Sequence, residues 1–303
     1  HWSLGDLFQA NGALEDIKNS FKNSKVLLLT SYNYAYLMSH CPYVDGVLID
    51  KRLPRWNIFY LLNLKKILSK YNFTHVFDLQ NSRRTNFYRK FIIPNCKWSS
   101  TDTTLEPGQS KKDFDKEPVL DRMKIQLEKS GINTNKIKKI DLTWSFVNIK
   151  KLIKQHTNGE YILIFPFCSK RNSNKKWPYF KNLVSELKQL YKNKYSILVA
   201  PGPGEINEAK TLNAKVVLDE NNKSINLNYL ISLVEKSSYV ISNDTGPAHI
   251  ASHLNKKGIS IFGSHTSPKK ISIENEKFKT IINQDLKKLT VDSVISEIKK
   301  SLN

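Results

Sequence analysis

Two polar turns, at 242–246 and 263–268, carry residue types that could bind a sugar or a phosphate. Each turn follows a short apolar run typical of a buried strand. The carboxyl ends of parallel strands meet at one edge of a sheet, where α/β proteins bind ligands. Asp244 in the first turn could accept hydrogen bonds from sugar hydroxyls, or it could cap the helix that follows. These turns predict a ligand site at the sheet edge.

The helix predicted over 248–254 begins directly after the first turn. Pro247 stands at its start, where proline is tolerated because that N–H has no partner within a helix. The unpaired N–H groups at such an end favour an anion. His249 and His253 share one helix face, a spacing that could bind zinc, but Ile250 stands where a zinc protease has glutamate. With no third ligand evident, we expect an anion here and no metal.

The pattern DTGPAH at Asp244–His249, followed after one strand by FGSHTSP at Phe262–Pro268, resembles the signature of the family 9 glycosyltransferases. These are the bacterial heptosyltransferases of lipopolysaccharide core synthesis, and the spacing between the two halves also matches. The resemblance implies an α/β fold of the GT-B class, in which two Rossmann-like domains with doubly wound parallel sheets face a central crevice. The residues it implies for binding a nucleotide-sugar donor are Asp244, Thr245, Gly246, His249 and Gly263.

Two further segments resemble the donor half of the family. In the family pattern K-x-W-P, the lysine two before the tryptophan meets the donor phosphate, which implies Lys175, two residues before Trp177. An ammonium beside a helix N-terminus would complete an anion site; without the resemblance, Lys175 reads as one more exposed lysine. Gly202 and Glu205 lie in a glycine-rich turn that the family places close to the nucleotide.

The first half of the chain offers a carboxylate and an acceptor segment. Asp6 could be a first-turn cap residue, or it could take a proton from a hydroxyl. The family carries Gly-Asp here, with the aspartate as its proposed catalytic base, so the resemblance implies that Asp6 is the base. The segment after the strand at 74–78 resembles the family's D-L-Q…R-S pattern, which implies that Gln80 and Arg84 contact the acceptor. A solvated basic helix face is the alternative for Arg84.

Strand and helix patterns alternate twice along the chain, as in a parallel α/β protein. We expect an acceptor-side domain at 1–150 and a donor-binding domain at 151–303, whose last helix could pack back on the first domain. The chain begins at His1, and we expect the first strand, before Asp6, to be missing from it. The polar stretch at 99–118 predicts a surface loop.

Composition restricts the classes of partner. The three cysteines are scattered without a C-x-x-C motif, which predicts a reducing compartment and no zinc site. No run approaches the roughly 20 apolar residues of a membrane span. The net charge of +21 could serve nucleic acid, an anionic membrane or an acidic substrate, or it could reflect the lysine-rich coding of an AT-rich genome. No zinc-finger, RRM or KH pattern is present, so nucleic acid is not expected.

The resemblance implies an inverting, metal-independent glycosyltransferase that needs no cofactor. Asp6 would deprotonate an acceptor hydroxyl, and Lys175 would stabilise the departing phosphates of the donor, ADP-heptose by family analogy. A nucleotide-sugar epimerase of the same architecture and a non-catalytic sugar- or lipid-binding module are the alternatives.

We expect a cytoplasmic monomer that acts on a lipid-linked or glycan acceptor and touches the inner membrane peripherally. A lipid-linked acceptor lies at the inner leaflet, where anionic lipids attract basic side chains. The candidates for this contact are Arg83, Arg84, Arg89, Lys90, Lys111 and Lys112.

Overall fold

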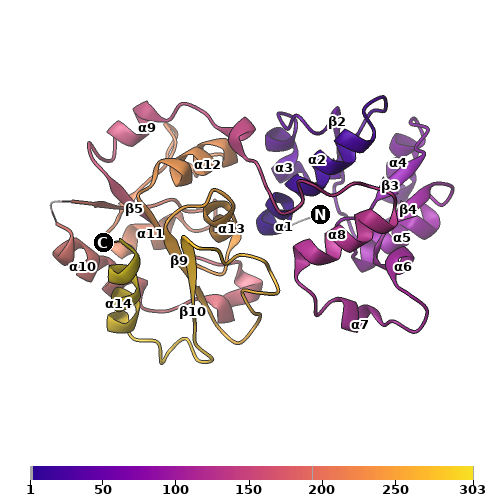
Figure 1. Cartoon of the computed structure of the whole chain (residues 1–303). Coiled ribbons are helices and arrows are strands. Elements are labelled where there is room, and N and C mark those ends of the chain that lie inside the picture. The colour runs from indigo at the N-terminus through magenta and orange to yellow at the C-terminus, as the bar shows by residue number, and fades with distance from the viewer. Residues whose placement is uncertain (1–2, 193, 303) are drawn as a thin grey trace. The chain divides into compact units, whose positions relative to one another are not determined.

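The computed structural model describes residues 3–192 and 194–302, which form two compact α/β units, His1–Ile140 and Asp141–Asn303 (Figure 1). The division falls between Ile140 and Asp141, ten residues before the boundary expected at 150, because the residues from Asp141 onward pack on the second unit. There the short helix η1 (Thr143–Ser145) lies against α12 (Leu227–Lys236). The Asn228 amide donates to the Ser145 carbonyl oxygen at 2.9 Å, and the Val147 N–H donates to the Ser232 hydroxyl at 2.8 Å.

The C-terminal unit is built on one parallel sheet with the strand order β10-β9-β8-β5-β6-β7. Every residue of β5, β8 and β9 is buried, and such apolar runs are typical of parallel strands covered on both faces. The strands are β5 (Tyr161–Phe165), β6 (Ser196–Val199), β7 (Lys215–Val216), β8 (Tyr239–Asn243), β9 (Gly258–Phe262) and β10 (Phe278–Ile282).

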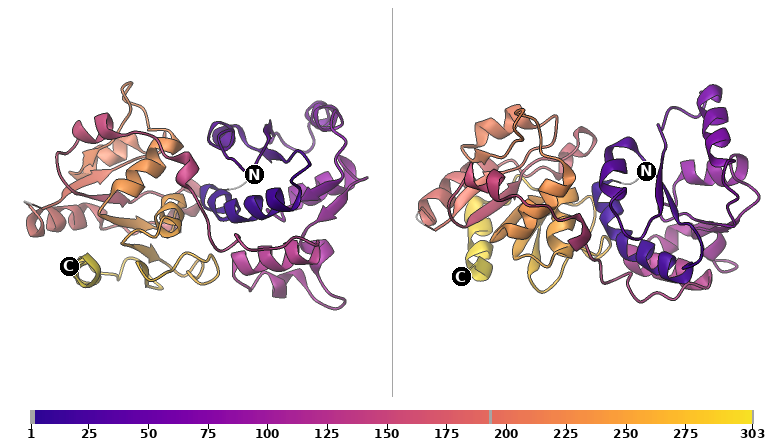
Figure 2. Two further views of the ribbon diagram at one scale, coloured as in Figure 1. Left: turned by 45° about the horizontal axis from the view of Figure 1, so that its top comes forward. Right: turned by 90° about the horizontal axis from the view of Figure 1, so that it is seen from above.

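Helices cover this sheet (Figure 2), and the core lies between them and the strands. Helix α14 packs on α10 and β9 of its own unit, with Val294 and Ile298 fully buried. Helix α12 packs on α13, which in turn contacts β8. The helices are α9 (Lys150–Lys154), η2 (Lys170–Lys175), α10 (Phe180–Leu190), α11 (Ile206–Ala209), η3 (Lys210–Leu212), α13 (Gly246–His253) and α14 (Val291–Leu302).

The N-terminal unit confirms the strand predicted at 74–78, but its described strands do not form one continuous sheet. Its described strands form two parallel pairs, β1 with β2 and β3 with β4. Their bounds are β1 (Leu27–Thr30), β2 (Gly46–Ile49), β3 (His75–Phe77) and β4 (Lys97–Ser99).

A largely apolar cavity of about 210 Å³ is lined by residues of both β1 and β3, among them Leu27, Leu29, Val76 and Phe77. In the C-terminal unit the chain enters at β5, builds β6 and β7 on one side of it, and then β8 and β9 on the other. The N-terminal unit likewise builds β1 and β2, then β3 and β4. The strand that the sequence predicts before Asp6 lies outside the described residues.

The helices of the N-terminal unit include short ones in a segment that was expected to be a loop. The stretch at 99–118, expected as a plain loop, contains α6 and α7, because serines at 100 and 110 begin short turns there. None of the described helices of the chain is long and apolar enough to cross a membrane. The helices are α1 (Leu4–Gln9), α2 (Asn11–Ser20), α3 (Tyr32–Met38), α4 (Ile58–Leu68), α5 (Arg83–Phe91), α6 (Thr101–Thr104), α7 (Lys111–Phe114) and α8 (Val119–Lys129).

Candidate active site

Asp244 is the centre of a charged cluster at the carboxyl edge of the C-terminal sheet. It directly follows β8 and is only 5% exposed. Its Oδ2 accepts a hydrogen bond from Lys175 Nζ at 2.6 Å and another from His265 Nε2 at 2.8 Å. Lys175 lies in the turn after β5 and His265 in the turn after β9. Three turns on neighbouring strands therefore converge, as the sequence predicts for two of them.

Asn243, which the sequence reasoning did not single out, fixes the turn that carries Lys175. Its side-chain amide donates to the Pro166 carbonyl oxygen at 2.7 Å and its Oδ1 accepts from the Trp177 N–H at 3.1 Å. Trp177 is fully buried, and its ring N–H donates to the Leu289 carbonyl oxygen at 2.9 Å. A residue buried at the end of β8 thus anchors both ends of the turn between β5 and α10, which limits the positions open to Lys175.

His265 is the second site residue that the sequence reasoning missed. It lies inside the FGSHTSP motif, which was the available signal, but no role was assigned to it. Its ring stacks on Phe262, with the ring centroids 6.2 Å apart and the planes 12° from parallel. A Cβ at Gly263 would lie 3.3 Å from His265 Nδ1, so glycine there leaves the imidazole room to reach Asp244.

The N-terminus of α13 lies beside this cluster. Thr245 is its N-cap residue, with extended backbone and no capping hydrogen bond from its side chain. The cap interpretation of Asp244 is therefore wrong: the carboxylate contacts Lys175 and His265 instead of the helix. Thr245 and Gly246 are half-buried, and the first turn of an α-helix leaves N–H groups without intrahelical partners. Together with the Lys175 ammonium, this end of α13 suits an anion.

His249 and His253 lie one turn apart on α13, with ring centroids separated by 6.2 Å. Burial, with a smaller contribution from the charge of His249, lowers the pKa of His253 to about 3. This ring therefore stays neutral at ordinary pH. Within residues 3–192 and 194–302, no group of three or more His, Cys, Asp or Glu side chains is arranged to hold a metal ion.

The turn after β6 carries Gly202 and Glu205. Glu205 Oε2 accepts from the Gly202 N–H at 2.7 Å, so the carboxylate closes its own turn. A Cβ at Gly202 would lie 3.1 Å from that oxygen, which explains glycine at this position. Burial raises the pKa of Glu205. Because the strands are parallel, this turn lies at the same sheet edge as the Asp244 cluster.

In the N-terminal unit, Asp6 combines a structural contact with access to a pocket. It is the third residue of a capping box: the Ser3 hydroxyl accepts from the Asp6 N–H, and Asp6 Oδ2 accepts from the Ser3 N–H at 3.2 Å. The interpretation of Asp6 as a first-turn capping residue is therefore confirmed. Asp6 also lines a pocket of about 140 Å³ together with Gln80 and Arg122. The structure thus brings the predicted base and one predicted acceptor residue to one cavity.

The turn that carries Gln80 is held by buried polar contacts. Asp78, at the end of β3, accepts from the N–H of Gln80 at 3.1 Å and of Asn81 at 2.9 Å, and burial raises the pKa of its carboxyl. Gln126 of α8 donates to the carbonyl oxygens of Asp78 at 3.1 Å and Ser99 at 3.0 Å. These bonds join the ends of β3 and β4 and fix the turn beside the pocket.

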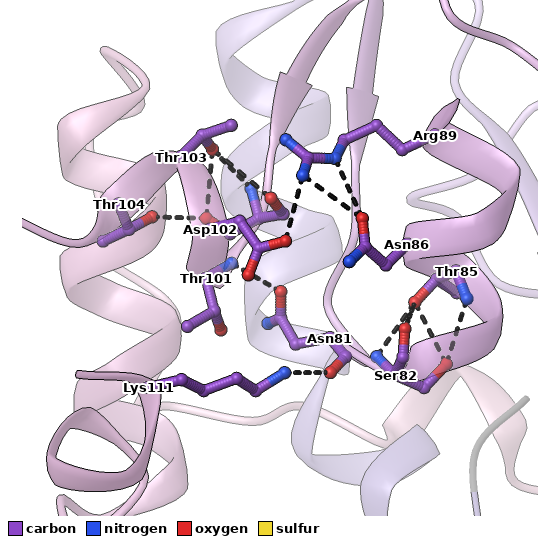
Figure 3. Close-up of polar contacts among 11 residues, drawn as sticks. Asn81, Ser82, Thr85, Asn86, Arg89, Thr101, Asp102, Thr103, Thr104 and Lys111 are labelled. Atoms are coloured by element: carbon purple, nitrogen blue, oxygen red, sulfur yellow. Dashed lines mark hydrogen bonds and ion pairs between the residues drawn. The ribbon is translucent and has the colours of Figure 1, made fainter. Parts of the chain in front are cut away.

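Arg84, the other predicted acceptor residue, does not line this pocket. Its guanidinium donates to the Leu53 carbonyl oxygen at 3.0 and 3.1 Å and to the Tyr88 hydroxyl at 3.2 Å. Figure 3 shows two more of the predicted membrane-facing cations in internal contacts. Arg89 pairs with Asp102 at 2.9 Å, and Lys111 donates to the Asn81 carbonyl oxygen at 2.7 Å.

The two α/β units and the cluster at the sheet edge define a glycosyltransferase of the GT-B class. Residues 61–294 match the profile of glycosyltransferase family 9 (heptosyltransferase). This match spans most of the chain, and the chain therefore belongs to that family. No curated protein matches its sequence significantly.

Solved structures of similar fold support the class. E. coli heptosyltransferase WaaC with ADP aligns at a TM-score of 0.73 and 18% identity, covering 99% of this chain and 97% of that one. E. coli ADP-heptose LPS heptosyltransferase II aligns at 0.69 and 16%, covering 100% and 96%. A family 9 glycosyltransferase from Veillonella parvula aligns at 0.75 and 14%, covering 99% and 94%.

Proposed function

We propose that this glycosyltransferase transfers a heptose from ADP-heptose to an acceptor of the lipopolysaccharide-core type or another glycan, with inversion at the anomeric carbon and without a metal ion. The observation that carries the proposal is the cluster of Lys175, Asp244 and His265 beside the N-terminus of α13. Family membership supports the sugar, and the similar WaaC structures carry ADP and ADP-2-deoxy-2-fluoro heptose.

The C-terminal unit supplies the donor site in this proposal. Asp244 accepts hydrogen bonds from donor sugar hydroxyls through its carboxylate. Lys175 has three N–H donors, so it can keep its contact with Asp244 and still bind a diphosphate oxygen. The remaining donor contacts come from turns at the same sheet edge and from the N-terminal part of α13. The turns carry Gly202, Glu205 and Gly263, and Thr245, Gly246 and His249 belong to α13 and its N-cap.

The N-terminal unit supplies the base. Asp6 takes the proton of an acceptor hydroxyl, whose oxygen then forms a bond to the anomeric carbon. The bond from that carbon to the diphosphate oxygen breaks, and ADP leaves with the bonding electron pair. Lys175 and the N–H groups of α13 stabilise the negative charge that develops on the leaving phosphate. Gln80 lines the pocket of Asp6 and would contact the acceptor. Arg84 would act near the acceptor by ordering the segment at Leu53.

The test is product analysis with a panel of nucleotide sugars and glycan acceptors. We expect ADP and a glycosylated acceptor to form in equal amounts, with NMR showing the inverted anomeric configuration. Retention of the anomeric configuration would refute the inverting mechanism. Activity with another nucleotide sugar but not with ADP-heptose would refute heptose as the transferred sugar. The fold also resembles a UDP-GlcNAc 2-epimerase from Methanocaldococcus jannaschii, at a TM-score of 0.59 and 12% identity. An epimerised nucleotide sugar formed without acceptor would favour that activity, and binding without turnover would favour a non-catalytic module.

The enzyme acts, on this proposal, as a cytoplasmic monomer that contacts the inner membrane peripherally to reach a lipid-linked acceptor. Fractionation of cells and sedimentation of the purified protein test location and oligomeric state.

A further inference from the structure

Helix α4 and the segment before it expose large apolar side chains. Trp56 is 80% exposed, Ile58 65%, Phe59 88% and Leu62 60%. A surface helix usually carries polar residues on its outer face. These four residues are close together in the chain, so they form a patch and are not the scattered single exposures common on protein surfaces.

The opposite face of α4 already has its partner. Tyr60, Leu64 and Leu68 are buried in a cluster with Tyr88 and Ile92, which come from α5 and its C-terminal end (Figure 1). The core of the unit therefore does not need the outer apolar residues. Their exposure calls for an apolar surface from outside the unit.

The charged residues of the segment that carries this patch have one sign. Residues 51–66 contain no aspartate or glutamate, and their five basic residues are all exposed: Lys51, Arg52, Arg55, Lys65 and Lys66. The carboxylate next to this stretch, Asp50, is buried and accepts hydrogen bonds from the hydroxyls of Tyr60 and Tyr88. The patch therefore presents apolar and cationic groups with no exposed anion among them.

Contacts with α5 hold the segment that carries the patch. The Arg55 guanidinium lies 5.7 Å from the ring centroid of Phe87, which lies 4.8 Å from that of Phe91, itself 58% exposed. The two bonds from Arg84 to the Leu53 carbonyl oxygen fix the backbone two residues before Arg55. The patch is thus a defined surface and not a free loop.

We propose that the α4 patch, formed by Trp56, Ile58, Phe59, Leu62 and the five basic residues around them, docks the N-terminal unit on an anionic phospholipid bilayer. An exposed Trp and an exposed Phe three residues apart suit the boundary between headgroups and acyl chains. Lysine and arginine beside them pair with lipid phosphates while their aliphatic stems lie on apolar surface. This combination of apolar groups with one sign of charge is typical of membrane-surface elements.

This proposal locates the membrane contact proposed above, and it rests on the proposed function, transfer to a lipid-linked acceptor. It assigns the contact to α4, whereas three of the basic residues first expected there, Arg84, Arg89 and Lys111, are engaged in internal contacts. Two kinds of force act at this surface. The apolar insertion is insensitive to salt, and the ionic attraction is screened by it.

The test is co-sedimentation with phosphatidylcholine vesicles that either contain or lack phosphatidylglycerol. The apolar variant is W56S/F59S and the charge variant is K51E/R55E. The matched controls lie in the C-terminal unit: Ile282→Ser, at an apolar residue 57% exposed, and K287E/K288E, at two exposed lysines. We expect the parent and both controls to bind anionic vesicles, and both patch variants to bind at least about 10-fold more weakly. The parent should lose affinity with added salt.

A second measurement locates the contact. Brominated lipids should quench the fluorescence of the parent, and W56F should lose most of that quenching while binding persists. Equal vesicle binding by parent and patch variants, or quenching that survives W56F, would overturn the proposal. If the parent binds no vesicles but forms a dimer, and the W56S/F59S variant is a monomer, the patch is a contact with a second copy of the chain instead. Transfer to a water-soluble acceptor should be unchanged in all patch variants, so a failure of the proposed sugar transfer is seen separately.

Discussion

Replacing Lys175 with methionine should separate the structural part of the Asp244 cluster from its chemical part. The variant leaves Asp244, 5% exposed, with His265 as its remaining described contact. Removing one partner of a fully buried ion pair costs about 3–5 kcal/mol. The Lys175 side chain is 23% exposed and His265 still donates to the carboxylate, so we expect a smaller loss of about 1–3 kcal/mol in the free energy of unfolding. For a unit of this size, that corresponds to a fall in Tm of roughly 2–12 °C.

The double variant K175M/D244N supplies the decisive comparison. It removes both charges, so its loss of stability should be smaller than the sum of the single losses by about 1–2 kcal/mol. Activity should behave differently. Without the Lys175 ammonium the developing phosphate charge lacks a donor, so kcat should fall by about 10²–10³ in both K175M and the double variant.

Urea unfolding and a donor-turnover assay measure the two effects side by side. Lys176→Met is the matched control, because this neighbouring lysine pairs with Glu208 at the surface. It should change stability by less than about 1 kcal/mol and turnover by less than about 3-fold. Additive stability losses would show that Lys175 and Asp244 are not coupled. Near-normal kcat in K175M would remove Lys175 from the chemistry.

Four further outcomes follow from particular residues. Asp6→Asn should lower the rate of sugar transfer by about 10²-fold or more, with ADP affinity nearly unchanged. Asparagine keeps an acceptor for the Ser3 N–H, so the helix cap and the Tm should be unchanged. Normal turnover in this variant would exclude Asp6 as the base. Activity should survive EDTA, since Lys175 and the N–H groups of α13 supply the positive charge; a loss reversed only by Mg²⁺ or Mn²⁺ would contradict this. Burial lowers the pKa of His253 from 6.5 to about 3, so between these pH values the unfolded chain binds a proton there that the folded chain does not. The free energy of unfolding should therefore fall as the pH drops from 6.5 to 3, by at most about 1.4 kcal/mol per pH unit. His253→Gln should flatten that slope in urea titrations, and an unchanged slope would assign it to other groups. Gly258→Ala should destabilise the C-terminal unit by about 1–3 kcal/mol, because its Cβ would lie 2.4 Å from the Val240 carbonyl oxygen, whereas Gly159→Ala, with no atom within 4 Å, should be neutral in the same thermal assay.

Much of the C-terminal unit could be predicted because its signals are local. The runs at β5, β8 and β9 are apolar and bounded by turn residues, so their identity as buried parallel strands does not depend on distant partners. Once the strands are parallel, the turns after them must share one edge. That is why the turns at 242–246 and 263–268 could be expected close together, whereas Lys175, 69 residues before Asp244, is assigned to this site only through the family resemblance.

Side-chain direction could not be predicted in the same way. Asp244 at a helix start looks like a cap, and only the position of Lys175 and His265 shows that its carboxylate turns away from the helix. Arg84 matches an acceptor residue, yet it binds the Leu53 carbonyl oxygen, a partner 31 residues away that no local pattern reveals.

The sequence by itself determined the parallel α/β class, the order of the strands along the chain and the turns that carry polar residues, because periodicity and turn chemistry are properties of neighbouring residues. Only the tertiary structure decided which face of α4 is buried, since that helix is apolar on both sides and the choice depends on where α5 lies. It also decided that the described strands of the N-terminal unit form two pairs, because strand pairing joins segments far apart in the chain and depends on which edges meet.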